Sequence, residues 1–111
     1  MRRPDIIRNK KDFSRLYSKG KSAGGKYIVL FHIKNGLNHS RHAFLASKKV
    51  GKSVQRNRAR RLLRESYRTH ESRIRQGYDI LFIARKTMEG VKCGEVEKSM
   101  FAMLRKSGLL I

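Results

Sequence analysis

The segment that most restricts the fold lies mid-chain and carries a dense run of positive charge, KKVGKSVQRNRARRLLRES over residues 48–66. Its cations up to position 64 are Lys48, Lys49, Lys52, Arg56, Arg58, Arg60, Arg61 and Arg64. No acidic residue precedes Glu65 within this segment, so these charges repel one another unless a polyanion lies beside them. A fold that contains this segment has to keep its charged side chains at the surface.

The same segment has the pattern of an amphipathic helix, with Ser53 as the candidate N-cap and an end near Thr69. One apolar-to-neutral stripe comprises Ala59, Leu62, Leu63, Ser66 and Tyr67. The opposite side carries Asn57, Arg60, Arg61, Arg64 and Arg68. Residues 56, 60, 64 and 68, all Arg, form an i+4 row of planar groups suited to phosphate. The exposed side predicts a nucleic-acid contact, and the alternative is an ordinary solvated face.

Composition places this helix in a small and strongly basic protein. We expect a single domain over residues 1–111, with a basic and flexible tail at residues 1–8, because this length supports one core. The 28 Lys and Arg against 8 Asp and Glu give a formal charge of +20, while 39% hydrophobic content favours a folded chain. Such charge indicates nucleic acid as the partner; a membrane surface is the weaker alternative, and no apolar stretch approaches the roughly 20 residues of a span.

Two further features favour a cytoplasmic protein. The start, MRRPDIIRNKKDF, lacks the apolar run that follows the charges of a secretion signal. Cys93 is the only cysteine, which excludes an internal disulfide and agrees with a reducing compartment. We expect Cys93 to be a small, partly buried side chain.

The remaining periodicity predicts an α+β fold around one sheet. A helix is expected from Lys10 to about Lys19, capped by Asn9 and stopped by Gly20. KYIVLFHIK (26–34) and HAFLAS (42–47) are expected strands, joined as a hairpin through a loop that contains Asn35-Gly36. GYDILFIARK (77–86) is a further strand, and a last helix reaches toward Gly108 through Val96, Met100, Met103 and Leu104. An additional strand near residues 22–25 or 35–41 stays open, and the strands flanking the basic helix are expected to be parallel.

Aromatic residues suggest a second surface. Phe13 and Tyr17 lie one helical turn apart, and Tyr27 and Phe31 project from one strand face. Aromatic rings among Lys and Arg are the usual platform for single-stranded nucleic acid. The same spacing is also typical of core positions, so pattern alone leaves both interpretations open.

The chain lacks the residue clusters that a protein nuclease needs. Metal-dependent hydrolysis requires gathered carboxylates, whereas Asp5, Asp12 and Asp79 are scattered, and Glu65 is expected to pair with Arg61. The histidines are His32, His39, His42 and His70. His39 and His42 are the one conceivable acid–base pair, but no third ligand accompanies them. We therefore expect no catalytic side chain and no metal ligand in the protein.

The run SKKVGKSVQRNRARRLLRE, centred on Arg56-Asn57-Arg58, resembles the signature of the bacterial ribonuclease P protein component. DFSRLYSKGKS resembles that family's first helix and turn, and GYDILFIARK resembles its strand after the basic helix, so the likeness covers about residues 10–86. It implies an α-β sandwich like the second domain of ribosomal protein S5, with the basic helix in a left-handed βαβ crossover. Strand twist by itself favours the right-handed form.

The resemblance also implies a function and its residues. The chain would be the protein subunit that helps a catalytic RNA, using Mg²⁺ held through that RNA, to remove the 5′ leader from precursor tRNA, with no protein partner required. The implied RNA-binding residues are Lys48, Lys49, Lys52, Arg56, Asn57, Arg58, Arg60, Arg61, Arg64 and Arg68. The implied leader-binding residues are Phe13, Tyr17, Ser22, Phe31, Arg85 and Lys86, with Lys48 and Lys49 at the rim. A structural RNA-binding protein, such as a ribosomal one, is the competing interpretation.

Overall fold

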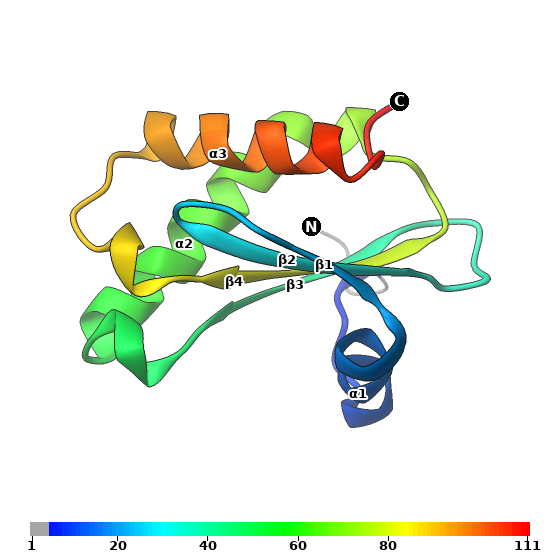
Figure 1. Cartoon of the computed structure of the whole chain (residues 1–111), viewed down its shortest axis with the longest axis horizontal. Coiled ribbons are helices and arrows are strands. Elements are labelled where there is room, and N and C mark those ends of the chain that lie inside the picture. The colour runs from blue at the N-terminus through cyan, green and yellow to red at the C-terminus, as the bar shows by residue number, and fades with distance from the viewer. Residues whose placement is uncertain (1–4) are drawn as a thin grey trace.

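The computed structural model describes residues 5–111, which form a four-stranded sheet with helices on both faces (Figure 1). The strands are β1 (Lys21–Gly24), β2 (Ile28–Lys34), β3 (Arg41–Ala46) and β4 (Tyr78–Ala84). The helices are α1 (Lys10–Lys19), α2 (Ser53–His70) and α3 (Cys93–Lys106). Short 3-10 turns occupy η2 (Lys48–Val50), η3 (Glu71–Arg73) and η4 (Lys86–Met88). The predicted α+β class is confirmed, and the additional strand that the sequence left open is β1.

The strand order is β1-β2-β4-β3, which places the last strand of the chain inside the sheet. β4 pairs antiparallel with β2 and parallel with β3, so the predicted parallel pair is confirmed. The predicted hairpin between β2 and β3 is wrong, because β4 lies between them. β4 is the most apolar strand and is buried on both faces, and such a strand belongs at the centre of a sheet. The left-handed sense of the crossover stays a prediction.

The larger core lies between the sheet and the pair α2 and α3, which cover one face together (Figure 1). The predicted stripe on α2 is confirmed, since the buried residues of that helix are Ala59, Leu62, Leu63, Ser66 and Tyr67. Tyr67 packs its ring against Phe44 and Phe82 of the sheet, with centroid separations of 5.6 and 5.5 Å. The expected apolar positions of α3 are also buried, namely Val96, Met100, Met103 and Leu104.

The helix ends follow the local signals with one exception. The Asn9 side chain accepts a hydrogen bond from the backbone N–H of Lys11, as predicted for the cap of α1. Ser53 is the first helical residue of α2 rather than its cap, and Lys52 takes the N-cap position without a side-chain bond. The Ser53 hydroxyl instead accepts a hydrogen bond from the Arg56 guanidinium at 3.2 Å. The first turn of α2 is therefore capped less well than the sequence suggests.

The opposite face of the sheet is covered by α1 at one end only (Figure 1). A smaller core forms there around Ile7, Leu16, Ala43 and Leu81. Ile6 bridges to His42 beside β3, and the Ile7 N–H donates to the carbonyl oxygen of His42 at 2.9 Å. Of the tail predicted over residues 1–8, positions 1–4 lie outside the described residues, and the remainder is packed against β3 from Ile6 onward. No helix in residues 5–111 has the length and apolar character needed to cross a bilayer.

A buried ion pair holds α1, β3 and β4 together at this end. Asp79 is 1% exposed, and its carboxylate accepts hydrogen bonds from Nε and Nη2 of Arg41 at 2.8 and 2.6 Å. Asn35 donates to the same carboxylate at 3.0 Å, and Asp12 of α1 lies 3.3 Å from Arg41. The hydrogen bond to Asp79 raises the pKa of Arg41. One guanidinium thus connects three elements of the fold.

Replacing Arg41 should destabilise the protein strongly, because Asp79 would be left buried without its cation. We expect Arg41→Ala to lower the free energy of unfolding by about 3 kcal/mol, measured by urea denaturation. Arg15→Ala is the matched control, since that exposed guanidinium donates one bond to the carbonyl of Lys34 and should cost no more than about 1 kcal/mol. Equal losses in the two variants would contradict this account.

Candidate nucleic-acid interface

The arginines of α2 point away from the sheet because the opposite stripe of the helix is buried against it. The cations and the amide predicted for RNA binding divide into two groups by exposure. Lys48, Lys49, Lys52, Asn57, Arg61, Arg64 and Arg68 are exposed. Arg56, Arg58 and Arg60 are half-buried. Most of the predicted set therefore lies on the molecular surface, along α2 and the turn before it.

Three residues in the middle of this set have partners within the protein. Arg58 turns toward the segment before α3, where its guanidinium donates to the carbonyl oxygen of Val91 at 2.9 Å. The Asn57 side-chain oxygen accepts a hydrogen bond from Arg60. Arg58 therefore braces α2 against the α3 side of the molecule, whereas Asn57 and Arg60 form a pair on the outer side.

A second group of cations gathers where β3 and β4 end. The carboxyl ends of parallel strands lie at the same end of a sheet. The turn η2 after β3 and the turn η4 after β4 are therefore in contact. Val50 and Met88 are buried and anchor the two turns, while Lys48, Lys49 and Lys86 stay exposed. Gly51 joins η2 to α2 with a φ of 138°, a conformation that favours glycine.

The residues predicted to hold a single strand meet on the face that α1 covers. Tyr17 is 49% exposed, and its ring meets that of Phe31 edge to face at 5.2 Å. Ser22 of β1 pairs with Phe31 of β2 and is exposed beside it. Phe13 is half-buried against the smaller core. Tyr17 and Phe31 consequently form the accessible aromatic pair, and Phe13 supports them.

An apolar row that the sequence analysis missed extends this surface toward the lysines of η2 and η4, where β3 and β4 end. Val29, Ile83 and Leu45 are register neighbours on adjacent strands and are half-buried, and Ile83 and Leu45 pack against the smaller core. Their positions could have been found from the alternation of β2, since Val29 lies two residues from Phe31. Arg85 follows this row, and its guanidinium donates to the carbonyl of Gly25 at 2.9 Å.

The two predicted surfaces meet around the edge strand β3. A hollow of about 220 Å³ lies there, lined by Ile6, Ile7, Phe13, His42, Ala43, Phe44, Leu45 and Arg64. Arg64 comes from the arginine side of α2, and Phe13 comes from the aromatic side of α1. His42 is 2% exposed beneath them, and burial lowers its pKa to about 4, so the ring is neutral at pH 7. The neutral ring adds no charge to the hollow.

Glu65, the one acid in the basic segment, contacts the side of the molecule that carries α3. The predicted pair between Glu65 and Arg61 is wrong: in residues 5–111 the Glu65 carboxylate accepts from the thiol of Cys93 at 3.9 Å instead. Glu65 occupies the side of α2 that faces α3, which directs it away from Arg61. Cys93 is half-buried, as expected. Among the described residues, no three His, Cys, Asp or Glu side chains gather as metal ligands would.

Comparison with known proteins gives the family. The family model described as Ribonuclease P matches residues 1–108. The chain belongs to this family. The ribonuclease P protein component of Alkaliphilus oremlandii is 42% identical over 94% of this chain and 91% of that protein. The component of Pelotomaculum thermopropionicum is 39% identical over 93% and 92%.

Solved structures of ribonuclease P proteins share the fold. The protein of Staphylococcus aureus aligns with a TM-score of 0.87 and 30% identity, covering 96% of this chain and 98% of that one. The protein of Thermotoga maritima aligns with a TM-score of 0.82 and 31% identity, covering 91% and 96%. The resemblance read from the basic segment is thereby confirmed. Membership of this family connects the function of the chain with tRNA processing.

Proposed function

We propose that the chain is the subunit that helps a catalytic RNA to remove the 5′ leader of precursor tRNA by endonucleolytic cleavage. The observation that carries this proposal is the meeting of two different surfaces around β3, one rich in arginine and one aromatic. An RNA that binds α2 and a single strand that binds beside α1 would lie next to each other. The protein would then act in the cytoplasm by binding and positioning, with no protein partner required.

The arginine side of α2 is suited to the catalytic RNA. Arg56, Arg60, Arg64 and Arg68 recur every fourth residue, about 6 Å apart along the helix axis. Guanidinium groups bind phosphate oxygens in pairs, and each neutralised phosphate releases counterions. Lys48, Lys49 and Lys52 extend the same surface beyond the N-terminus of α2. We therefore assign this row of arginines to the folded RNA.

The aromatic side is suited to the unpaired leader. Bases stack on exposed rings whatever their sequence, and Tyr17 with Phe31 offers such rings. The apolar row of Val29, Ile83 and Leu45 continues the floor. Phosphates would be held at its rim by Ser22, Lys48, Lys49, Arg85 and Lys86. Mature tRNA has no leader, so this surface distinguishes the precursor from its product.

We assign magnesium to the RNA rather than to the protein. The carboxylates of Asp12 and Asp79 both lie against Arg41, whose positive charge opposes a bound cation there. These residues therefore do not fit a magnesium site. Phosphate oxygens of the RNA are suitable hard ligands for this ion. The protein lowers the magnesium requirement indirectly, because binding the folded RNA stabilises it.

The test of the proposed function is cleavage of a 5′-extended precursor tRNA at limiting magnesium. Three reactions are compared: the protein alone, a bacterial ribonuclease P RNA alone, and the two together. We expect activity only in the mixture, since the RNA supplies the chemistry and the protein supplies binding. Tight RNA binding without stimulation would instead indicate a structural RNA-binding protein.

The arginine row should matter most when magnesium is scarce. We expect Arg60→Ala combined with Arg64→Ala to slow cleavage more at limiting than at saturating magnesium, because the RNA then depends on the protein for charge neutralisation. Two lost phosphate contacts should also reduce the salt dependence of RNA binding by about 1.8 in log–log slope. Arg75→Ala removes an exposed cation outside both surfaces and serves as the control. An equal loss at both magnesium levels would reject the electrostatic role.

Tyr17 is the best probe of leader binding, because it is exposed and contributes little to the core. We expect Tyr17→Ala in the holoenzyme to weaken precursor tRNA binding by about 5-fold or more, as for loss of one stacked base. Mature tRNA binding should stay unchanged, and Tyr17→Phe should restore precursor binding. If precursor and mature tRNA lose affinity alike, Tyr17 does not contact the leader.

A further inference from the structure

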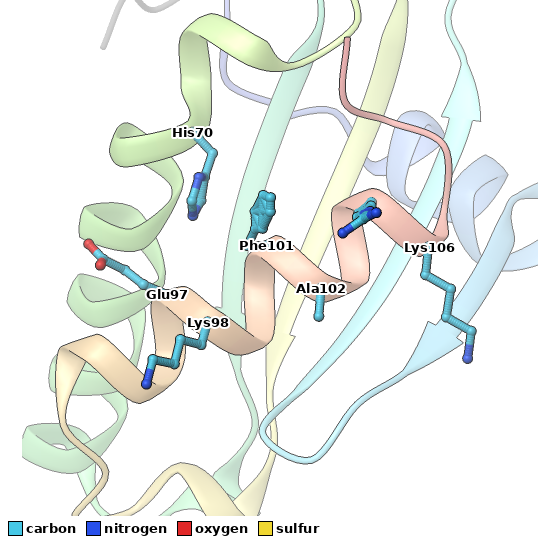
Figure 2. Close-up of a pocket in the computed structure, with 7 residues that line it drawn as sticks. His70, Glu97, Lys98, Phe101, Ala102 and Lys106 are labelled. Atoms are coloured by element: carbon cyan, nitrogen blue, oxygen red, sulfur yellow. The ribbon is translucent and has the colours of Figure 1, made fainter.

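A groove lies on the outer side of the helical layer, where the last turn of α2 meets α3 (Figure 2). It has a volume of about 750 Å³ and is lined by His70, Glu97, Lys98, Phe101, Ala102, Arg105 and Lys106. We call it the α2–α3 groove. It lies across the sheet from α1, so it is separate from the surface assigned to the leader (Figure 1). Nothing in the proposed function uses it.

The floor of the α2–α3 groove is apolar and contains an aromatic ring that the core does not require. The core side of α3 is already filled by Val96, Met100, Met103 and Leu104. Phe101 is half-buried, with its ring 5.3 Å from that of His70, which projects from α2 beside it (Figure 2). The Arg73 guanidinium lies 5.5 Å from the centre of the Phe101 ring. A half-exposed ring beside an arginine is a stacking platform for a base.

The rim of the groove is strongly positive. Lys98 and Lys106 extend from opposite ends of the groove along α3 (Figure 2), and Arg105 adds a third cation from its last turn. Glu97 is the single acid among the lining residues, and its carboxylate accepts a hydrogen bond from the Thr69 hydroxyl at 2.8 Å. A ligand that complements this groove has a flat apolar part and carries negative charge. A nucleotide has both properties.

His70 adds a second ring to the groove wall, 5.3 Å from that of Phe101. The protein itself buries the Nε2 atom of this ring, so a ligand in the groove meets the ring rather than that nitrogen.

We propose that the α2–α3 groove binds an unpaired nucleotide of ribonuclease P RNA. The base lies against Phe101 and Ala102, and the flanking phosphates contact Lys98, Arg105 and Lys106. The assignment rests on the proposed function for the identity of the RNA. A second copy of this chain is disfavoured as the occupant, because each copy carries a formal charge of +20. An apolar peptide would leave the cations of the rim without partners.

The first test is a charge placed on the groove floor. Ala102 is exposed, so Ala102→Glu leaves the core intact, and Ala102→Gln is the matched neutral control. We expect Ala102→Glu to weaken binding of the catalytic RNA by about 10-fold through repulsion of phosphate, and Ala102→Gln to change it by no more than about 2-fold. Affinity is measured by titrating the full-length protein into labelled RNA.

Two further comparisons separate stacking from charge. Phe101→Leu should weaken RNA binding by about 5-fold or more, whereas Phe101→Trp should retain it, because only the second variant keeps an aromatic face. Lys98→Ala with Lys106→Ala should reduce the salt slope by about 1.4, the value for two contacts with single-stranded phosphate. The control pair, Lys19→Ala with Lys34→Ala, removes equal charge from residues outside the groove and should reduce the slope less.

The outcomes distinguish this inference from the proposed function. Arg60→Ala with Arg64→Ala is titrated in parallel, and its loss of affinity shows that the RNA is bound through α2. If that loss occurs while Ala102→Glu and Phe101→Leu bind as the original protein does, the groove proposal is overturned and the subunit function stands. Self-association that Ala102→Glu abolishes, with RNA affinity unchanged, would make the groove a protein interface and would also overturn the proposal.

Discussion

The burial of one stripe of α2 against the sheet determines how the rest of the molecule presents its charge. Tyr67 packs edge to face against the stacked rings of Phe44 and Phe82, and Leu63 is fully buried in the same core. Because this stripe cannot leave the core, the cationic side of the same helix has one direction available, which is outward. The packing of the buried stripe thus offsets the electrostatic repulsion among the arginines. A polyanion bound to the cationic side would reduce that repulsion.

Helices cover the two faces of the sheet to different extents. This difference leaves part of one face accessible as a binding surface. α2 and α3 cover one face, whereas α1 has 10 residues and covers only part of the other. The half-buried row of Val29, Ile83 and Leu45 therefore stays partly accessible beside the aromatic pair. Arg41 holds the position of α1 through Asp12 while its main partner is the buried Asp79. A fixed α1 keeps the width of that apolar surface constant.

Local signals in the sequence predicted the helices. Asn9 and Gly20 mark the ends of α1, and the spacing from Ala59 to Tyr67 gives the buried side of α2, because each depends on neighbours within a few residues. The prediction that Tyr27 and Phe31 share one strand face is wrong, because Tyr27 precedes β2 and packs against the larger core, whereas Phe31 packs against the smaller one. The other failures concern distant parts of the chain. The insertion of β4 between β2 and β3 and the pairing of Arg41 with Asp79, 38 residues later, are set by packing. The groove beside Phe101 likewise depends on how two helices cross.

The bond from Arg58 to the carbonyl of Val91 separates this arginine from the others in its segment. Its neighbours Arg56 and Asn57 lie on the outer part of α2, while Arg58 ties the helix to the chain that enters α3. A substitution at Arg58 would therefore disturb how α2 is held against the rest of the protein, whereas substitutions at Arg56 and Asn57 would change only the outer part of the helix.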